Sequence, residues 1–234
     1  MERNSSGQPV EGTPETAPEA AAREPRKKFF DARRIAYFGV FAALEVILLV
    51  WGSAIPVGAT GAMLNFSLLP IVLGAILLGP LSGAFLGLVS GVVILIMVAA
   101  GAQGVFSILF LDEPVMIALI CLVKTTAAGC VSGLLYRLIR SKNGTAAVFC
   151  AAAAAPVVNT GVFILGCLCI GGAIEAWWGS AQGMSASAFY IIIVSFVGLN
   201  FFIELAINLV LAPALSTVIR VAEKQFRIGK KRKK

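Results

Sequence analysis

Residues 66–100 read FSLLPIVLGAILLGPLSGAFLGLVSGVVILIMVAA and contain no charged side chain. A helix needs about 20 predominantly apolar residues to cross the hydrocarbon core of a bilayer, so this run is long enough for two crossings. Gly79-Pro80 divides it, because proline ends or sharply kinks a helix. Residues 66–79 are short for a full crossing. We therefore expect the first of the two helices to be short, to be tilted, or to begin near Met63.

The rest of the chain continues this pattern, and hydrophobic residues make up 59% of its 234 residues. Six apolar segments are long enough, or nearly long enough, to span a bilayer. They cover about residues 35–54, 66–78, 80–100, 114–139, 145–170 and 187–219. The sequence therefore predicts an all-α membrane protein with six transmembrane helices.

The distribution of lysine and arginine predicts the orientation of these helices. The basic residues other than Lys124 lie within residues 1–34, 137–142 and 220–234. The connections on the opposite side, residues 55–64, 101–113 and 171–186, contain no lysine or arginine. Because short basic segments next to membrane spans stay in the cytoplasm, both termini are expected to be cytoplasmic. We expect the protein in the plasma membrane of a prokaryote.

Composition divides the chain into three regions. Residues 1–30 form a polar and basic N-terminal tail that has no apolar run and is expected to be disordered. Residues 31–222 form the six-helix membrane domain, and residues 223–234 form a basic cytoplasmic tail. Beside a membrane span such a tail contacts anionic lipid. Nucleic-acid binding is not expected, because no basic globular domain exists to carry it.

Several classes of chemistry are excluded by missing residues. The chain has no histidine, and all five cysteines sit in apolar segments, which excludes the common mixed metal sites and a histidine-based proton relay. It contains no P-loop motif, and no serine–histidine or paired-aspartate arrangement for hydrolysis. We therefore expect no enzyme activity, no catalytic residue, no cofactor and no metal.

Two stripes of small residues recur at helical spacing. Gly83, Gly87 and Gly91 lie four residues apart, a spacing that lets helix backbones approach closely. Internal packing is the simplest interpretation of this stripe. The first apolar segment carries Ala32-x-x-x-Ala36 and Gly39-x-x-x-Ala43. On a first, peripheral helix such a stripe is either internal packing or a docking surface for another membrane protein.

Lys124 is the only basic residue inside the hydrophobic part of the chain. An ionisable group in mid-membrane is costly and marks a substrate or ion site by default. Two interpretations stay open. Lys124 forms a neutralising ion pair with Glu45 or Glu204, or it is a cationic anchor for an anionic substrate. In the second case, Asn159 and Asn200 supply hydrogen-bond donors and acceptors.

Asn159 lies in the run Pro156-Val-Val-Asn-Thr-Gly161. The proline frees a backbone carbonyl and the glycine permits close approach, so we expect an interrupted helix of the kind that lines a cavity. Glu204 and Asn208 lie toward the cytoplasmic half of the last apolar segment, and we interpret them as structural.

Two of the outer connections have a mixed composition. Residues 55–63 and 171–179 are semi-apolar and glycine-containing, and the second holds Trp177 and Trp178. Tryptophans near a span usually belong to the aromatic belt at the membrane interface. The alternative is that both connections fold as lids over an outward-facing pocket.

The run from Leu64 to Gly83 resembles the second span of the substrate-binding S components of energy-coupling factor (ECF) vitamin transporters. It has a polar-Phe-Ser start, a proline a few residues later, and a Gly-Pro break followed by a glycine. Residues 33–43, RRIAYFGVFAA, resemble the first helix of that family, with Gly39 in place of the first alanine of its Ala-x-x-x-Ala stripe.

This resemblance implies a division of labour. The chain would capture a vitamin or related micronutrient from outside with high affinity. A transmembrane coupling (T) subunit and two ATPase subunits would bind it through the first helix, and ATP-driven reorientation would release the substrate inside. The docking stripe would comprise Ala32, Ala36, Gly39 and Ala43. The substrate site would comprise Lys124, Asn159, Asn65, Asn200, Trp177 and Trp178.

The substrate follows from a second likeness. Residues 156–163, PVVNTGVF, look most like members that take pantothenate, whose carboxylate would suit Lys124, and folate-type members come next. A riboflavin substrate would leave the buried cation without a partner. The alternative function is a stand-alone secondary transporter or channel for a small anionic solute, although no inverted repeat is visible.

Overall fold

The computed structural model describes residues 32–54, 56–57, 62–63, 65–183 and 185–231. A compact unit begins at Ala32. The expected N-terminal tail, residues 1–30, lies outside the described residues. So does most of the first expected lid, residues 55–63, of which two short strands are described, β1 (Pro56–Val57) and β2 (Ala62–Met63). The strands pair antiparallel, with Pro56 opposite Met63.

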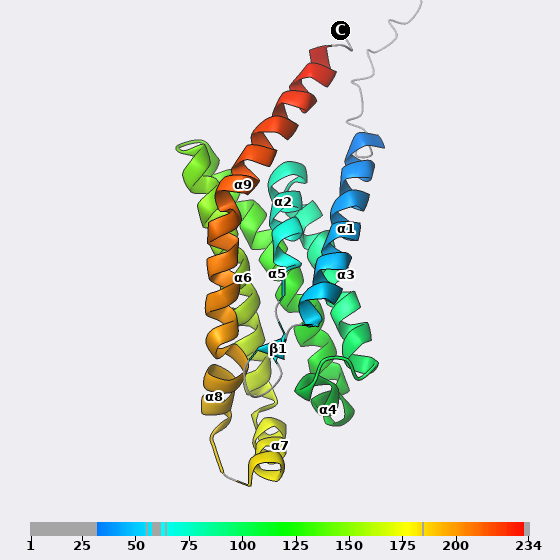
Figure 1. Ribbon diagram of the computed structural model, residues 1–234, viewed down its shortest axis with the longest axis vertical. Coiled ribbons are helices and arrows are strands. Elements are labelled where there is room, and N and C mark those ends of the chain that lie inside the picture. The colour runs from blue at the N-terminus through cyan, green and yellow to red at the C-terminus, as the bar shows by residue number, and fades with distance from the viewer. Residues whose placement is uncertain (1–31, 55, 58–61, 64, 184, 232–234) are drawn as a thin grey trace, which may run out of the picture. The chain divides into compact units, whose positions relative to one another are not determined.

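Helices form nearly all of the described structure (Figure 1). They are α1 (Ala32–Ser53), α2 (Leu68–Leu78), α3 (Pro80–Ala99), α4 (Val105–Asp112), α5 (Pro114–Arg140), α6 (Gly144–Cys169), α7 (Gly171–Gln182), α8 (Ala188–Tyr190), the π-helix η1 (Ile191–Val197) and α9 (Gly198–Lys231). Five stretches of the described chain are long and apolar enough to cross a membrane. They are Arg34–Ser53, Pro80–Ala99, Pro114–Arg140, Gly144–Cys169 and Ala188–Ile219.

Helix α2 is the remaining predicted span, and its shortness is confirmed. Its 11 residues rise about 16 Å at 1.5 Å per residue, roughly half the hydrocarbon thickness. Gly79 separates it from α3 with a φ of 110°, a conformation that favours glycine. Pro80 then begins α3, as the Gly-Pro break predicted.

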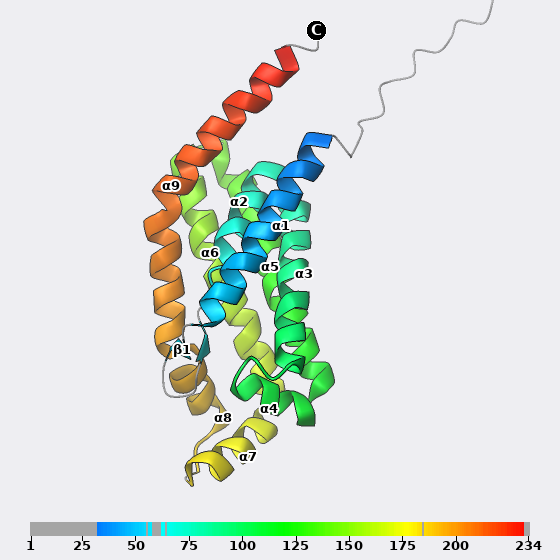
Figure 2. The same ribbon diagram turned by 45° about the vertical axis from the view of Figure 1, so that its right-hand side comes forward.

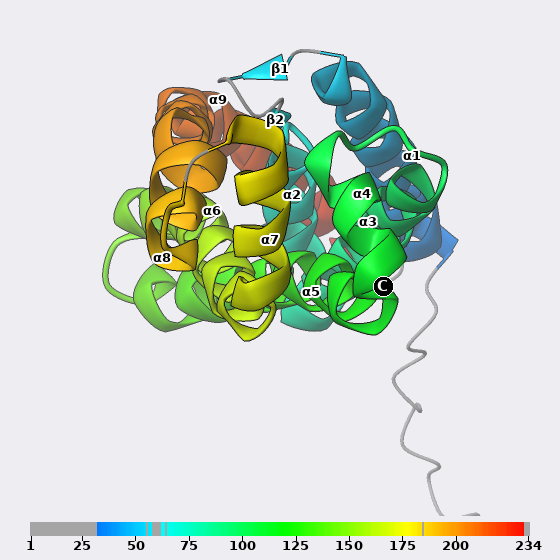
Figure 3. The same cartoon turned by 90° about the horizontal axis from the view of Figure 1, so that it is seen from below.

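The position of α2 explains how so short a helix is held. It contacts α1, α3, α5, α6 and α9, and nine of its 11 residues are buried. Figure 3 looks along the bundle and shows α2 inside the longer helices. Helix α2 is therefore an apolar centre of the bundle, held by the longer helices around it.

The glycine stripe of α3 packs against α5, which confirms the internal-packing interpretation. A Cβ on Gly83 would lie 2.6 Å from the carbonyl oxygen of Gly129, and one on Gly91 would lie 2.7 Å from that of Cys121. A Cβ on Gly87 would collide with the carbonyl of Thr125. The two backbones are therefore in direct contact over two turns, as small residues at this spacing permit.

The outer connections after α3 and α6 are more ordered than their composition indicated. The expected loop at residues 101–113 contains α4, and the glycine-containing lid at residues 171–179 is part of α7. Both helices are apolar enough to pack on the bundle: Leu109 and Ile174 are fully buried. The second lid is thus a short helix rather than an irregular flap.

The ends of the compact unit lie together. Helix α1 begins and α9 ends at one end of the bundle, opposite α4 and α7 (Figures 1 and 2). This arrangement agrees with an even number of crossings. Helix α9 continues to Lys231, so residues 223–231 of the expected basic tail are helical, and residues 232–234 lie outside the described part.

We expect Gly87→Ala to lower the unfolding temperature in detergent, because the added methyl group must displace the α5 backbone at Thr125. Overpacking of this kind costs about 1–3 kcal/mol. Gly172→Ala in α7 is the matched control, since its Cβ would meet nothing within 4 Å. It should gain helix propensity of up to about 1 kcal/mol. Equal stability of Gly87→Ala and the unmodified protein would contradict the close contact.

Candidate functional site

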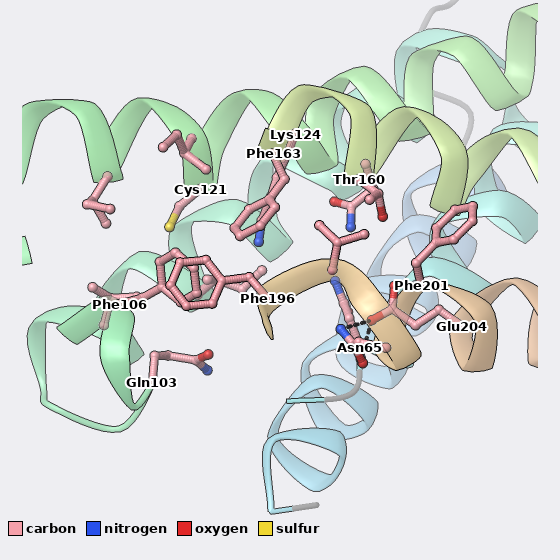
Figure 4. Close-up of a pocket in the computed structure, with 17 residues that line it drawn as sticks. Asn65, Gln103, Phe106, Cys121, Lys124, Thr160, Phe163, Phe196, Phe201 and Glu204 are labelled. Atoms are coloured by element: carbon pink, nitrogen blue, oxygen red, sulfur yellow. Dashed lines mark hydrogen bonds between the residues drawn. The ribbon is translucent and has the colours of Figure 1, made fainter. Parts of the chain in front are cut away.

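A cavity of about 100 Å³ lies among the long helices (Figure 4). Its walls come from α3, α4, α5, α6, η1, α9 and the segment just before α2. The polar lining residues are Asn65, Gln103, Lys124, Asn159, Thr160, Asn200 and Glu204. The remaining lining residues are apolar apart from Cys121, and four of them are phenylalanines: Phe106, Phe163, Phe196 and Phe201.

Lys124 is half-buried on α5 and its ammonium nitrogen Nζ lies 5.2 Å from the centre of the Phe163 ring. Within the described residues, it forms no ion pair with Glu45 or with Glu204. A cation–π contact contributes about 0.5–2 kcal/mol, much less than the cost of withdrawing an ammonium from water. The ammonium group of Lys124 can therefore donate hydrogen bonds to an anionic or carbonyl oxygen of a ligand in the cavity.

Glu204, on α9, lines the same cavity and is only 4% exposed. Its Oε1 accepts hydrogen bonds from the backbone N–H of Asn65 at 2.9 Å and from Nδ2 of Asn200 at 3.2 Å. The carboxylate therefore ties the segment before α2 to α9. Its place in the cavity wall differs from the purely structural role that we expected from its depth in the span.

Asn208 keeps the structural role predicted for it. It is 2% exposed, and its Nδ2 donates to the backbone carbonyl of Glu204 at 2.8 Å. It is not among the residues that line the cavity.

Asn159 is 6% exposed on α6 and its Oδ1 has no hydrogen-bond partner within the described residues. The expected helix interruption is wrong, since α6 runs unbroken through Pro156. Proline removes only its own N–H donor here, and the helix absorbs that loss. The expected close approach at Gly161 is also wrong, because a Cβ there would meet nothing within 4 Å. Asn159 reaches the cavity from a regular helix.

Aromatic rings close the cavity on the side of α4 and α7. The Phe106 ring packs edge-to-face on Phe163 and on Phe196, each with ring centres 5.2 Å apart. Trp177 lies behind Phe196 at 6.2 Å, and Trp178 packs on Trp177. Neither tryptophan lines the cavity around Lys124. They reach the cavity only indirectly, because Trp177 packs on Phe196, which is a lining residue.

A chain of polar contacts leads from the cavity toward α1. Asn65 Oδ1 accepts from the backbone N–H of Ser67 at 3.1 Å and from its Oγ at 2.6 Å. Ser67 Oγ is 2.8 Å from Ser90 Oγ on α3. Ser90 in turn faces Glu45, which is 0% exposed. Neither carboxylate oxygen of Glu45 meets hydrogen-bond geometry with a described residue, so Glu45 is a buried acid outside the cavity.

The tertiary structure thus brings together four of the six expected substrate residues: Lys124, Asn159, Asn65 and Asn200. Sequence reasoning missed the phenylalanines and the role of Glu204. Two signals were available. Phe163 lies four residues after Asn159, and Glu204 lies four residues after Asn200, so each pair shares a helix face. Nothing in the sequence linked Phe106 to these faces.

Comparison with known proteins adds a family. The family model for the substrate-specific component of ECF transporters matches residues 33–216 of this chain. A comparison with curated proteins found no match. The matched range includes every residue that lines the cavity.

The two buried acids should respond differently to removal. We expect Glu204→Leu to lower the unfolding temperature in detergent, because it strands the N–H groups of Asn65 and Asn200, at a cost of about 1–3 kcal/mol. Glu45→Leu, the matched change, should preserve or raise the unfolding temperature, because it removes a buried acid that lacks hydrogen-bond partners. The reverse order of the two melting temperatures would contradict this assignment.

Proposed function

Because the chain belongs to the family of ECF transporter substrate-specific components, we propose that it is the high-affinity substrate-binding subunit of an ECF-type importer. Members of this family are transporter subunits and not enzymes. In this proposal the protein captures a vitamin or related micronutrient from outside the cell. The observation that carries the proposal is the cavity that Lys124, which forms no ion pair within the described residues, lines together with Asn159, Asn65 and Asn200.

The charge of the cavity supports an anionic substrate, with pantothenate first and folate second. Lys124 would bind the substrate carboxylate through a charge-assisted hydrogen bond. Asn159, Asn65 and Asn200 would orient the rest of the molecule, as a few polar groups do in most small-molecule sites. Trp177 and Trp178 would act through the aromatic wall on which they pack.

The membrane arrangement in this proposal has six spans, with α2 as the short one, and both termini in the cytoplasm of a prokaryotic cell. The shared end of α1 and α9 supports an even number of spans. Arg137, Arg140 and Lys142 lie where α5 ends, at a site that the distribution of basic residues puts inside. The cavity then lies in the outer half of the bundle, toward the end where α4 and α7 lie.

Energy would come from partner subunits. The stripe on α1 leaves Ala36, Gly39 and Ala43 exposed, and a Cβ on Gly39 would meet nothing within 4 Å. Such a smooth surface suits close helix packing against a transmembrane coupling subunit, which would in turn bind two ATPases. Ala32 completes the stripe in sequence, and its side chain lies outside the described part.

We expect purified protein, without any ATPase, to be stabilised by one water-soluble vitamin in a thermal-shift screen. Lys124→Met should then weaken that vitamin's affinity, measured by calorimetry, by roughly 10- to 150-fold, since a hydrogen bond to a charged group contributes about 1.5–3 kcal/mol. Lys142→Met, an exposed residue outside the cavity, is the matched control. Unchanged affinity in folded Lys124→Met would remove Lys124 from the site.

Enlarging the α1 stripe should separate binding from uptake. We expect Gly39→Leu and Ala43→Leu to abolish co-purification with the coupling subunit and ATP-dependent uptake, while vitamin affinity stays within twofold of the unmodified protein. Ala214→Leu, an exposed alanine on α9, is the control of equal size. Uptake that persists in both stripe variants, or in cells without the ATPases, would favour a stand-alone secondary transporter or channel.

A further inference from the structure

We propose that Glu204 is a second charged recognition group of the substrate site, opposite in sign to Lys124, and that it determines specificity. We call Lys124 and Glu204 the two poles of the site. It follows that the substrate is a compact carboxylate whose far end carries O–H or N–H donors. This inference rests on the proposed function of the cavity around Lys124 and adds a requirement to it. The expected anionic substrate needs only Lys124, whereas the substrate inferred here must also satisfy a buried acceptor.

The two charged groups of the cavity are separate. Glu204 and Lys124 both line it and lie close enough for their charges to interact, yet no ion pair joins them in the described residues. Figure 4 shows the lysine on the green α5 and the glutamate on the orange α9, with the cavity between them. A ligand that enters therefore meets a cation at one wall and a carboxylate at another.

The carboxylate of Glu204 has acceptor capacity left over. A carboxylate offers about four lone-pair sites on its two oxygens. Within the described residues, both donors, the N–H of Asn65 and Nδ2 of Asn200, bind the same oxygen, Oε1. Oε2 is left for a donor from the cavity. A residue that is 4% exposed cannot rely on bulk water for that donor.

Asn159 adds a second acceptor. Its Oδ1 is buried, has no partner among the described residues, and belongs to a side chain that lines the same cavity. Leaving such an oxygen unpaired costs about 1–3 kcal/mol. Among the polar residues that line the cavity, Lys124 thus offers a cation, and Glu204 and Asn159 each offer an acceptor oxygen that can take a donor from a ligand. A matching ligand supplies one anionic oxygen group and at least two O–H or N–H donors.

Size limits the ligand further. The cavity of about 100 Å³ is small beside the roughly 300–1,000 Å³ of sites that bury drug-sized ligands. Phe163 and Phe196 form apolar walls next to the charged groups, so the ligand also presents apolar carbon groups to them. Pantothenate has this chemistry, with a carboxylate, an amide N–H and two hydroxyls on a short chain.

Simpler ligands fail on one side of the cavity. A fatty acid or inorganic anion would satisfy Lys124 but would bring no donor to Oε2 of Glu204 and would be repelled by its charge. An amine without a carboxylate would satisfy Glu204 but would be repelled by Lys124. Buried groups left unpaired are what allow a polar site to reject analogues strongly. A site with these two poles is therefore expected to reject both kinds of ligand, the anion that lacks donors and the amine that lacks a carboxylate.

The test is calorimetry on detergent-purified full-length protein with three probes. Pantothenate carries both ends, pantothenyl alcohol replaces the carboxylate with a hydroxyl, and 4-methylpentanoate keeps a carboxylate but has no donors. We expect pantothenate to bind at least tenfold more tightly than either analogue, because each analogue loses the hydrogen bond to one of the two charged residues. A wider vitamin screen on the same protein identifies any other ligand.

Two variants assign the poles. Glu204→Gln keeps an oxygen for Asn65 and Asn200, and it should weaken pantothenate and pantothenyl alcohol equally, by about tenfold or more. Lys124→Met should weaken pantothenate alone, so that acid and alcohol bind alike. Glu45→Gln changes a buried acid outside the cavity and should leave all affinities unchanged. Melting curves establish that each variant is folded.

The outcomes separate the two proposals. If Glu204→Gln binds the vitamin within twofold of the unmodified protein, or if 4-methylpentanoate matches pantothenate, the second pole is refuted while the vitamin-binding function stands. Binding of a vitamin that lacks a carboxylate, or lacks donors, also refutes it. If no water-soluble vitamin binds the unmodified protein, the proposed function itself fails, and the inferred substrate class fails with it.

Discussion

Direct backbone contact between α3 and α5 is the constraint from which the rest of the structure follows. In a bilayer the hydrophobic effect does not drive helices together, so close packing must. The glycines at 83, 87 and 91 leave α3 without side chains where it meets the α5 backbone. The contact fixes the rotation of α5 about its own axis. That rotation turns Lys124 toward the cavity instead of toward lipid, where its charge would be far more costly.

Polar groups in the core of the bundle are arranged around a single short helix. Because α2 spans only part of the membrane, the residues just before it reach the middle of the bundle. Asn65 and Ser67 lie there and connect Glu204 on α9 with Ser90 on α3. A full-length α2 would fill this space with apolar side chains. The start of α2 at Leu68, rather than earlier in the chain, therefore leaves room for a polar site.

The same bundle presents two features of different chemistry, a polar cavity and an exposed stripe of small residues. Its outer half encloses a polar cavity behind a wall of phenylalanines, supported by Trp177 on α7. Its first helix presents a smooth lipid-facing stripe at Ala36, Gly39 and Ala43. The polar chain from Asn65 to Ser90 ends beside Glu45, which belongs to α1. The cavity around Lys124 and helix α1 are thus joined by buried polar residues rather than by apolar packing alone.

The sequence by itself determined the membrane class, the helix break at Gly79-Pro80 and the packing stripe on α3, because hydropathy, proline and glycine act locally. It also identified Lys124, since a lone charge in an apolar run is visible without a structure. Only the tertiary structure decided what Lys124 faces. It left the lysine unpaired, put Glu204 in the same cavity, and made α7 a support for the aromatic wall. These relations join residues far apart in the chain, and they depend on helix rotation and depth, which apolar sequences barely encode.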